Sequence, residues 1–205
     1  VRCLRISSKP APTMRLLIIS NMAHYVANDM IVGHGPTARE ISSLASLFDE
    51  VRHIACLHAG SAPALMLPYT SDRVHLVPVR PAGGPRLIDK LRIIRLIPHY
   101  LWAMLRELPQ ADVVHIRCPA NISLIALLLL AFTRKPRARW IKYAGNWQPD
   151  RKEAISYTFQ RWWLKRNFAR AQVTINGEWP QQPAHIHPFL NPCLTDDEIN
   201  DANCA

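Results

Sequence analysis

The segment Val113-Val114-His115-Ile116-Arg117-Cys118-Pro119 runs from apolar, strand-forming residues directly into a polar cluster. Two further segments repeat this pattern: Leu16-Leu17-Ile18-Ile19 leads into Ser20-Asn21, and Trp140-Ile141-Lys142-Tyr143 leads into Gly145-Asn146-Trp147. The carboxyl ends of parallel strands share one edge of a sheet, and open α/β sheets bind their ligands at that edge. The pattern therefore predicts a parallel sheet with a small-molecule site where these three segments end.

Strand signals alternate with helical patterns along most of the chain, which predicts an α/β fold: a Rossmann-like parallel sheet with helices on both faces, in a single domain. A long loop is expected at 21–35, and a helix should begin near Pro36. Apolar residues at helical spacing predict a helix over 86–108 that Pro98 should kink or split. The apolar run Ile122–Phe132 is too short to span a bilayer and is interpreted as a buried helix. Strands are expected at Arg15–Ser20, Val51–Leu57, Val74–Val79, Asp112–Ile116, Arg139–Tyr143 and Gln172–Ile175.

The composition describes a basic chain of 205 residues with a formal net charge of +10, long enough for one domain with a full core. Such a charge attracts nucleic acid, anionic lipid head groups or phosphorylated small molecules. No nucleic-acid partner is predicted, because RNA-binding aromatic pairs, zinc-finger spacing and a compact helix-turn-helix are all missing. The cysteines are odd in number and scattered, so neither a disulfide framework nor a metal site is predicted, and reduced thiols in the cytoplasm fit best.

Three segments are expected along the chain. Residues 1–13 have neither a period nor an apolar run, so they are interpreted as a disordered or misassigned leader, with Met14 as the working start. Residues 14–178 should form the domain. Residues 179–205 are rich in proline, and we expect them to be irregular and to add no further strands.

Two clusters offer groups that could hold an anion. Gly33 and Gly35 flank the start of a predicted helix, where free backbone N–H groups could line a cleft and bind phosphate, although turn geometry alone would also need glycine. They do not form a dinucleotide or Walker fingerprint. Arg117 ends a strand with a guanidinium suited to phosphate or carboxylate, and the alternative is that it pairs with a local acidic side chain. We interpret His115 as structural.

A third cluster combines the functional groups of a sugar site. Lys142, Tyr143, Asn146 and Trp147 supply a cation, a phenol, an amide and an indole around Gly145, and they are predicted to contact an acceptor or sugar. A surface turn closed by glycine and asparagine is the alternative.

Two helical patterns carry basic residues beside aromatic ones. One reading is a face that meets anionic lipid head groups, with aromatic rings at head-group depth. The other reading is that Trp162 and Trp163 pack in the core while the basic residues face water. The residues of this membrane-surface hypothesis are Arg92, Arg95, Arg106, Arg161 and Lys165.

At these residues the chain resembles the N-terminal half of a GT-B glycosyltransferase of the family 4 type, over most of Met14–Thr195. The similar parts are the opening strand with its glycine-bearing loop (Met14–Pro36), the strand Asp112–Pro119 and the segment Lys142–Trp147. Gln160-Arg161-Trp162, then 173–177 and 187–192, follow in the expected order.

The resemblance implies the acceptor-binding half of an enzyme that transfers a sugar from a nucleotide-sugar to a cell-envelope or polysaccharide precursor. The acceptor would be a sugar or a lipid-linked molecule, and the enzyme would be cytoplasmic, peripheral on the inner face of the cell membrane. The nucleotide-sugar would bind mainly to a C-terminal domain that this sequence lacks, so the chain alone is expected to be inactive. That domain would belong either to a longer version of this protein or to a separate subunit.

The resemblance assigns no cofactor. It also assigns no catalytic residue, because Arg117 stands where the family often has a second histidine. A hypothesis from a different class also remains open: a non-catalytic module that binds a membrane surface or a phosphorylated ligand.

Overall fold

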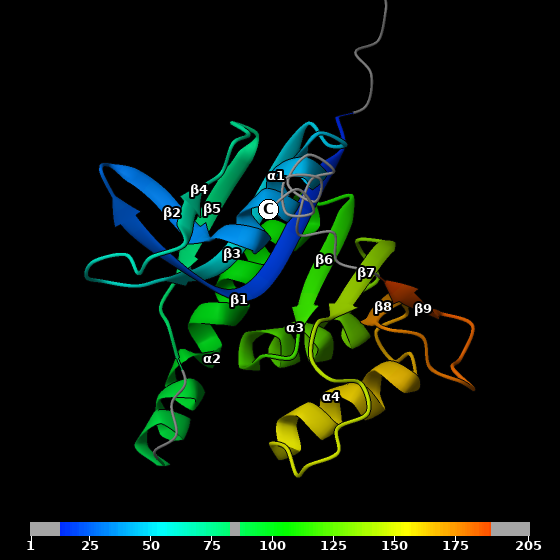
Figure 1. The fold of residues 1–205 in the computed structure, drawn as a ribbon. Coiled ribbons are helices and arrows are strands. Elements are labelled where there is room, and N and C mark those ends of the chain that lie inside the picture. Colours follow the sequence, from blue (N-terminus) through cyan, green and yellow to red (C-terminus); the bar gives the residue numbers. More distant parts are fainter. Residues whose placement is uncertain (1–12, 83–86, 190–205) are drawn as a thin grey trace, which may run out of the picture.

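The computed structural model describes residues 13–82 and 87–189, except for the side chains of residues 87–92. The expected leader and the end of the expected tail therefore lie mostly outside the described residues. One mixed, mostly parallel sheet with helices on both faces forms a single α/β domain (Figure 1). The strands are β1 (Arg15–Ala27), β2 (Met30–His34), β3 (Glu50–Leu57), β4 (Met66–Pro68), β5 (Val74–Val79), β6 (Val113–Cys118), β7 (Ala138–Tyr143), β8 (Gln172–Asn176) and β9 (Ile186–Phe189). The helices are α1 (Gly35–Ala45), α2 (Leu87–Glu107), α3 (Asn121–Phe132) and α4 (Ile155–Lys165), with a short 3-10 helix at Leu108–Gln110.

Seven strands run parallel in the order β5-β3-β1-β6-β7-β8-β9. From β1 the chain first builds outward through β3 and β5, and then returns to the other side of β1 with β6. The strand order therefore reverses between β1 and β6, whose register pairs Ile19 with Ile116. Each of the six expected strands overlaps one of these seven.

The expected loop at 21–35 is wrong, because β1 continues to Ala27 and turns back into β2 as an antiparallel hairpin. The turn residues Asn28 and Asp29 both have positive φ, 49° and 58°, which is the geometry of the tight turns that join antiparallel strands. β4 pairs with the free side of β2. The hairpin therefore replaces an irregular crossover with a rigid extension of the central strand.

The expectation of irregular structure after residue 178 is also wrong for one segment. β9 extends the sheet parallel to β8, and the His185 carbonyl accepts a 2.8 Å hydrogen bond from Val173 N–H. Ile186 is buried in the core. Pro188 is tolerated because β9 is an edge strand, where a missing N–H removes no bond from an inner ladder.

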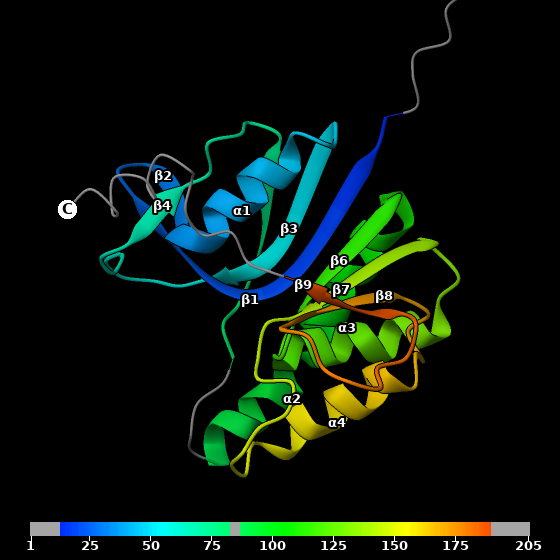
Figure 2. The same ribbon diagram turned by 45° about the vertical axis from the view of Figure 1, so that its right-hand side comes forward.

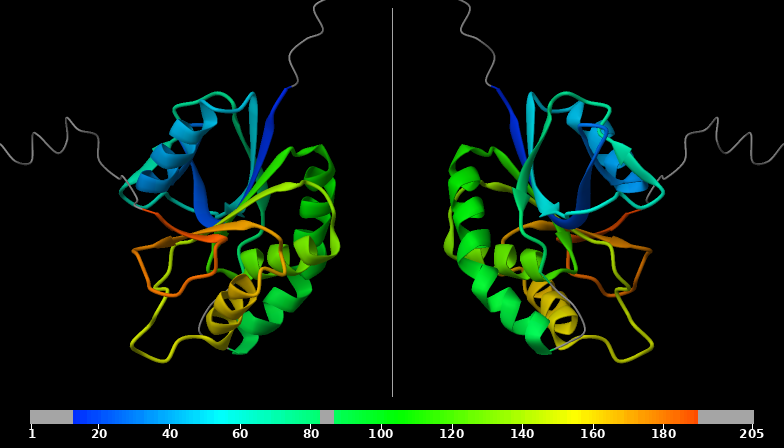
Figure 3. Two further views of the ribbon diagram at one scale, coloured as in Figure 1. Left: turned by 90° about the vertical axis from the view of Figure 1, so that its right-hand side faces the viewer. Right: turned by 90° about the vertical axis from the view of Figure 1, so that its left-hand side faces the viewer.

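The core has two layers, one on each face of the sheet (Figures 2 and 3). Side chains alternate along β1, so Leu16 and Ile18 pack under α1, whereas Leu17 and Ile19 face the layer of α2, α3 and α4. The expected buried helix at Ile122–Phe132 is confirmed in part, because α3 buries only one of its sides. α2 continues through Pro98, which therefore does not split it.

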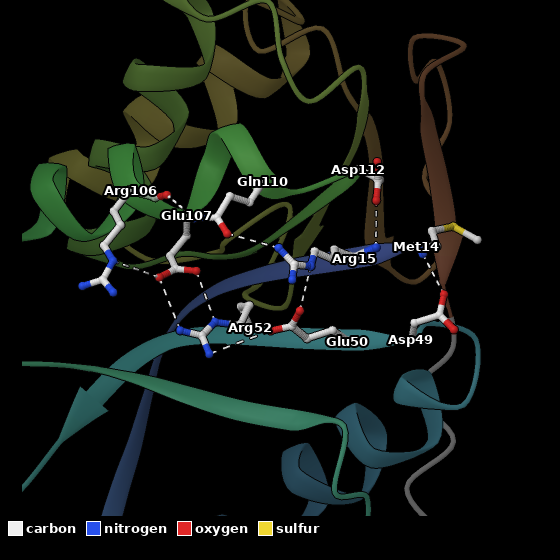
Figure 4. A network of polar contacts seen from close by, with 9 residues as sticks. All are labelled: Met14, Arg15, Asp49, Glu50, Arg52, Arg106, Glu107, Gln110 and Asp112. Atoms are coloured by element: carbon white, nitrogen blue, oxygen red, sulfur yellow. Dashed lines mark hydrogen bonds and ion pairs between the residues drawn. The ribbon is translucent and has the colours of Figure 1, made fainter. Parts of the chain in front are cut away.

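Ion pairs and hydrogen bonds join the amino ends of the central strands (Figure 4). Arg15 Nε lies 2.7 Å from Glu50 Oε2, and Arg15 N–H donates to Asp112 Oδ2 at 2.9 Å. Arg52 Nε lies 3.2 Å from Glu107 Oε2, which ties β3 to the end of α2. These contacts hold β1, β3, α2 and the segment before β6 together at the edge opposite the predicted site.

Candidate functional site

A hollow of about 470 Å³ lies at the carboxyl edge of the sheet, beside the point where the strand order reverses. We call it the switch-point hollow. The middle of β1, the start of α1, the end of β6 and the segment after β7 all contribute to its wall. Ser20, His34, Thr37, Arg117, Pro119 and Gly145 are among its lining residues. The predicted position of a ligand site and an actual concavity therefore coincide.

Arg117 lines this hollow and also pairs with an acidic side chain. Its two terminal nitrogens each donate to one carboxylate oxygen of Glu40 on α1, at 3.0 Å. A guanidinium has five N–H groups. The remaining three have no acceptor among the described residues, so Arg117 keeps donors for an anionic ligand while Glu40 fixes its orientation.

Lys142 shares the same carboxylate, because its Nζ lies 2.6 Å from Glu40 Oε1. Burial alone would raise the pKa of Glu40, but hydrogen bonds and charges from Arg117 and Lys142 outweigh it and lower that pKa. Among the described residues, two cations therefore share this one carboxylate. Lys142 is only 1% exposed, which makes it a charge beneath α1 rather than a direct sugar contact.

The four predicted sugar contacts do not assemble into one site. Tyr143 follows Lys142 on the strand and so points to the opposite face, where its hydroxyl accepts a 2.9 Å hydrogen bond from Arg161. Trp147 is buried and donates to Gln182 Oε1 at 3.1 Å. Asn146 is exposed, and its side-chain oxygen accepts the N–H of Gln148. Of this segment, Gly145 lines the hollow.

Arg161, which the membrane-surface hypothesis includes, is buried in the structure. Its side chain is buried between Tyr143, to which it donates a hydrogen bond, and Glu153, with which it forms an ion pair. The physical reason is that α4 presents this position to the sheet. Arg95, Arg106 and Lys165 are exposed, and the side chain of Arg92 lies outside the described residues.

Gly35 is required by packing against backbone, whereas Gly33 lies against side chains that include the flexible end of Met22. A Cβ atom on Gly33 would lie 2.4 Å from Met22 Cε, and one on Gly35 would lie 2.8 Å from the Leu65 carbonyl oxygen. These contacts favour the alternative in which the glycines serve local geometry. His34, between them, lines the hollow.

Sequence reasoning missed Glu40, which organises the site. One signal could have found it: Glu40 is the only acidic residue in the helix expected after Pro36. It also lies three positions after Thr37, on the same helical face as that hollow-lining residue. His115, interpreted as structural, is fully buried with its ring stacked 3.8 Å from the ring of Trp140.

A larger hollow of about 1100 Å³ adjoins the first. The two share Asn21, Pro119 and Ala120, and the larger one extends toward the starts of α3 and α4. Gln160 of α4 supports this junction, since its side-chain oxygen accepts the Ala120 N–H at 3.3 Å. The carboxyl edge therefore offers room for a ligand longer than one sugar ring.

No protein-family model and no curated protein matches the sequence. Among the described residues, no three His, Cys, Asp or Glu side chains come together as metal ligands do. In the same part of the chain, every helix is too short or too polar to cross a membrane.

Proposed function

We propose that this chain is the acceptor-binding half of a glycosyltransferase that moves a sugar from a nucleotide-sugar to a cell-envelope or polysaccharide precursor. One observation carries the proposal: two joined hollows lie where the parallel strand order reverses. Numbered along the chain, the seven parallel strands follow the order 3-2-1-4-5-6-7. That order supports a Rossmann-like domain of the kind that forms one half of a GT-B fold, because such sheets bind ligands at this crevice.

The two hollows suit different parts of an acceptor. The switch-point hollow has the Arg117 guanidinium in its wall, which favours a sugar next to a phosphate or another anion. The larger hollow includes Pro81, Ile93 and Ile155 in its wall, which favours the less polar remainder of a lipid-linked acceptor.

The transfer itself needs a second domain facing this edge. An acceptor hydroxyl would attack the anomeric carbon of the nucleotide-sugar, and the nucleoside diphosphate would leave. The donor domain could be a further part of the same protein or a separate subunit. The residues of this chain hold and orient the acceptor, and no resident metal or cofactor is proposed.

Transfer of labelled sugar tests the proposal. The chain is combined with a donor domain of the GT-B type, and labelled nucleotide-sugars are offered with lipid-linked acceptors. We expect transfer only when both halves are present, and a reduction of about tenfold or more for Arg117→Lys, which keeps the charge but loses the paired N–H geometry. Arg170→Lys, at an exposed position, is the matched control and should not change the rate. Continued absence of transfer with a competent donor half would refute the enzyme and favour a phospho-ligand-binding module.

A second candidate function, attachment to an anionic membrane surface, is favoured by the outer side of the helical layer. Trp102 and Trp162 are 60% and 45% exposed, and Phe132 is 87% exposed. Cations accompany them: Arg106 lies over the Trp102 ring at 5.5 Å and Arg166 over the Trp162 ring at 5.9 Å. Exposed aromatic rings beside basic residues favour head-group contact. This function is compatible with the first and would place the enzyme on the inner, cytoplasmic face of the membrane.

A further inference from the structure

Four side chains form a continuous hydrogen-bonded chain between the sheet and the switch-point hollow. Ser20 Oγ lies 2.7 Å from His53 Nε2, and His53 Nδ1 lies 2.7 Å from the Tyr69 hydroxyl. The Tyr69 hydroxyl lies 2.6 Å from His24 Nε2. His24 Nδ1 completes the chain at 3.1 Å from the Met22 carbonyl oxygen. Ser20, His24 and His53 are each at most 2% exposed.

One backbone carbonyl determines the direction of every bond in this chain. A carbonyl oxygen only accepts, so His24 Nδ1 must carry a hydrogen and, in the neutral ring, Nε2 must accept. Tyr69 therefore donates its single hydroxyl hydrogen to His24. The Tyr69 oxygen must then accept from His53 Nδ1, which leaves His53 Nε2 as an acceptor. Ser20 consequently donates its hydroxyl hydrogen to His53.

Both imidazoles are held in the neutral form that this reasoning requires. Burial lowers the pKa of His24 to about 4, and burial together with neighbouring positive charge lowers that of His53 well below its ordinary value. Neutral rings therefore agree with the arrangement of hydrogens that the Met22 carbonyl favours.

The arrangement leaves Ser20 with a defined role at the hollow. Its hydrogen is committed to His53, and its oxygen accepts the Met22 N–H at 3.1 Å. A hydroxyl oxygen has two acceptor lone pairs, so one remains. Ser20 lines the switch-point hollow together with Arg117, whose three uncommitted N–H groups can only donate.

We propose that Ser20 is a specificity-determining residue that accepts a hydrogen bond from a ligand hydroxyl while Arg117 binds an anionic group of the same ligand. The ligand class is a hydroxylated anion such as a sugar phosphate. This inference rests on the proposed function for its ligand and deepens it, because it states which group on the ligand the hollow recognises. His53, Tyr69 and His24 are positioning residues that keep the Ser20 hydrogen away from the ligand.

The hydrogen arrangement can be tested without any ligand. Nitrogen NMR of the full chain, labelled at the histidine rings and measured at pH 7, distinguishes the two neutral tautomers. We expect both His24 and His53 to carry their hydrogen on Nδ1. A hydrogen on Nε2 of His53 would overturn the proposal, because Ser20 would then accept from His53 and present its own hydrogen to the hollow.

Ligand selectivity provides the second test, with glucose 1-phosphate and inorganic sulfate as probes. Sulfate supplies the negative charge without a hydroxyl group. The unaltered chain should bind glucose 1-phosphate more tightly, and Ser20→Ala should remove about a tenfold preference while leaving sulfate affinity unchanged. Equal affinities in the unaltered chain, or no binding of either anion, would overturn the proposal.

Tyr69→Phe separates this role from simple packing, because Tyr69 is not among the residues that line the hollow. Without the phenol oxygen, His53 can move its hydrogen to Nε2 and donate to Ser20, so the preference for glucose 1-phosphate should fall as it does for Ser20→Ala. Tyr25→Phe is the matched control, since the Tyr25 hydroxyl makes no hydrogen bond to the described residues. If the tautomers and the selectivity are as predicted but no sugar is transferred, the role of Ser20 is supported and only the glycosyltransferase proposal is refuted.

Discussion

Glu40 on α1 accepts two parallel hydrogen bonds, each 3.0 Å long, from Arg117 at the end of β6, which lies 77 positions further along the chain. Lys142 on β7 reaches the same carboxylate. One acidic side chain therefore joins the first helix to two strands at the edge that carries the hollow. The stability of the fold and the geometry of the candidate site depend on the same contact.

Glu40→Gln should destabilise the protein by about 3 to 5 kcal/mol, because it removes the negative charge that two largely buried cations share. Arg117 and Lys142 side chains are 13% and 1% exposed. Urea unfolding at pH 7 measures the change. Glu50→Gln is the matched control: Glu50 pairs with Arg15, which is 40% exposed, so its loss should cost about 1 kcal/mol or less. Equal effects of the two substitutions would contradict this account of the cluster.

Stability should fall as the pH is lowered from 6.5 toward 4. Burial lowers the pKa of His24 to about 4 and that of His115 to about 3, and it lowers the pKa of His53 as well. Below pH 6.5 these histidines bind protons in the unfolded chain but stay neutral in the folded chain. Their contribution to the free energy of unfolding is therefore full above pH 6.5 and falls below it. Each histidine contributes a slope of about 1.4 kcal/mol per pH unit.

Urea unfolding at several pH values between 7.5 and 4.5 measures this dependence. His115→Phe retains a ring to stack on Trp140 but removes one titrating group, so it should reduce the slope. A stability that does not vary with pH over this range would show that the three rings are not held neutral.

Gly35→Ala should destabilise the protein by about 1 to 3 kcal/mol, the usual range for an overpacked position. The new Cβ would lie 2.8 Å from the Leu65 carbonyl oxygen, which also accepts the Gly35 N–H at 3.0 Å. A backbone atom held by this bond cannot move aside as the end of a flexible side chain could. Thermal unfolding provides the measurement. Ser43→Ala, on the exposed side of α1, should stay within about 0.5 kcal/mol of the unaltered chain.

Replacing both Trp102 and Trp162 by alanine should weaken binding to vesicles that contain anionic lipid. Both rings are exposed, so the substitutions remove membrane contacts without opening the core. Co-sedimentation with vesicles of phosphatidylglycerol and phosphatidylcholine should show a loss of about tenfold, and raised salt should weaken the remaining binding. Trp140→Phe, on the far face of the sheet, serves as the control. Unchanged vesicle binding of the double variant would exclude the helical layer as the membrane-facing surface.

The sheet was predictable wherever apolar runs signal a strand, as at Val51–Leu57 and Val74–Val79. The hairpin was missed because the polar residues Asn21 and His24 interrupt the apolar pattern of β1, and only the structure shows that His24 belongs to a buried network. β9 was missed because Pro188 argues against a strand unless its edge position is known.

The candidate site was predictable at the level of its location and of Arg117. The hydrogen bonds within the site were not predictable, because the Glu40–Arg117 pair and the Ser20–His53 pair join residues that only tertiary structure brings together. The sequence could also have shown that Lys142 and Tyr143 face opposite sides of the sheet, because they are neighbours on one strand.

The polar contacts at the amino ends of the central strands lie at the opposite edge from the ligand hollows. Many of the polar contacts that hold the central strands together therefore lie at an edge with no proposed ligand site. Under the proposed function, substitutions around Asn21 or Thr37 should alter the ligand hollow while Arg15, Glu50 and Arg52 keep the strands aligned. This separation would allow the hollow to change during evolution without loss of the contacts that stabilise the sheet.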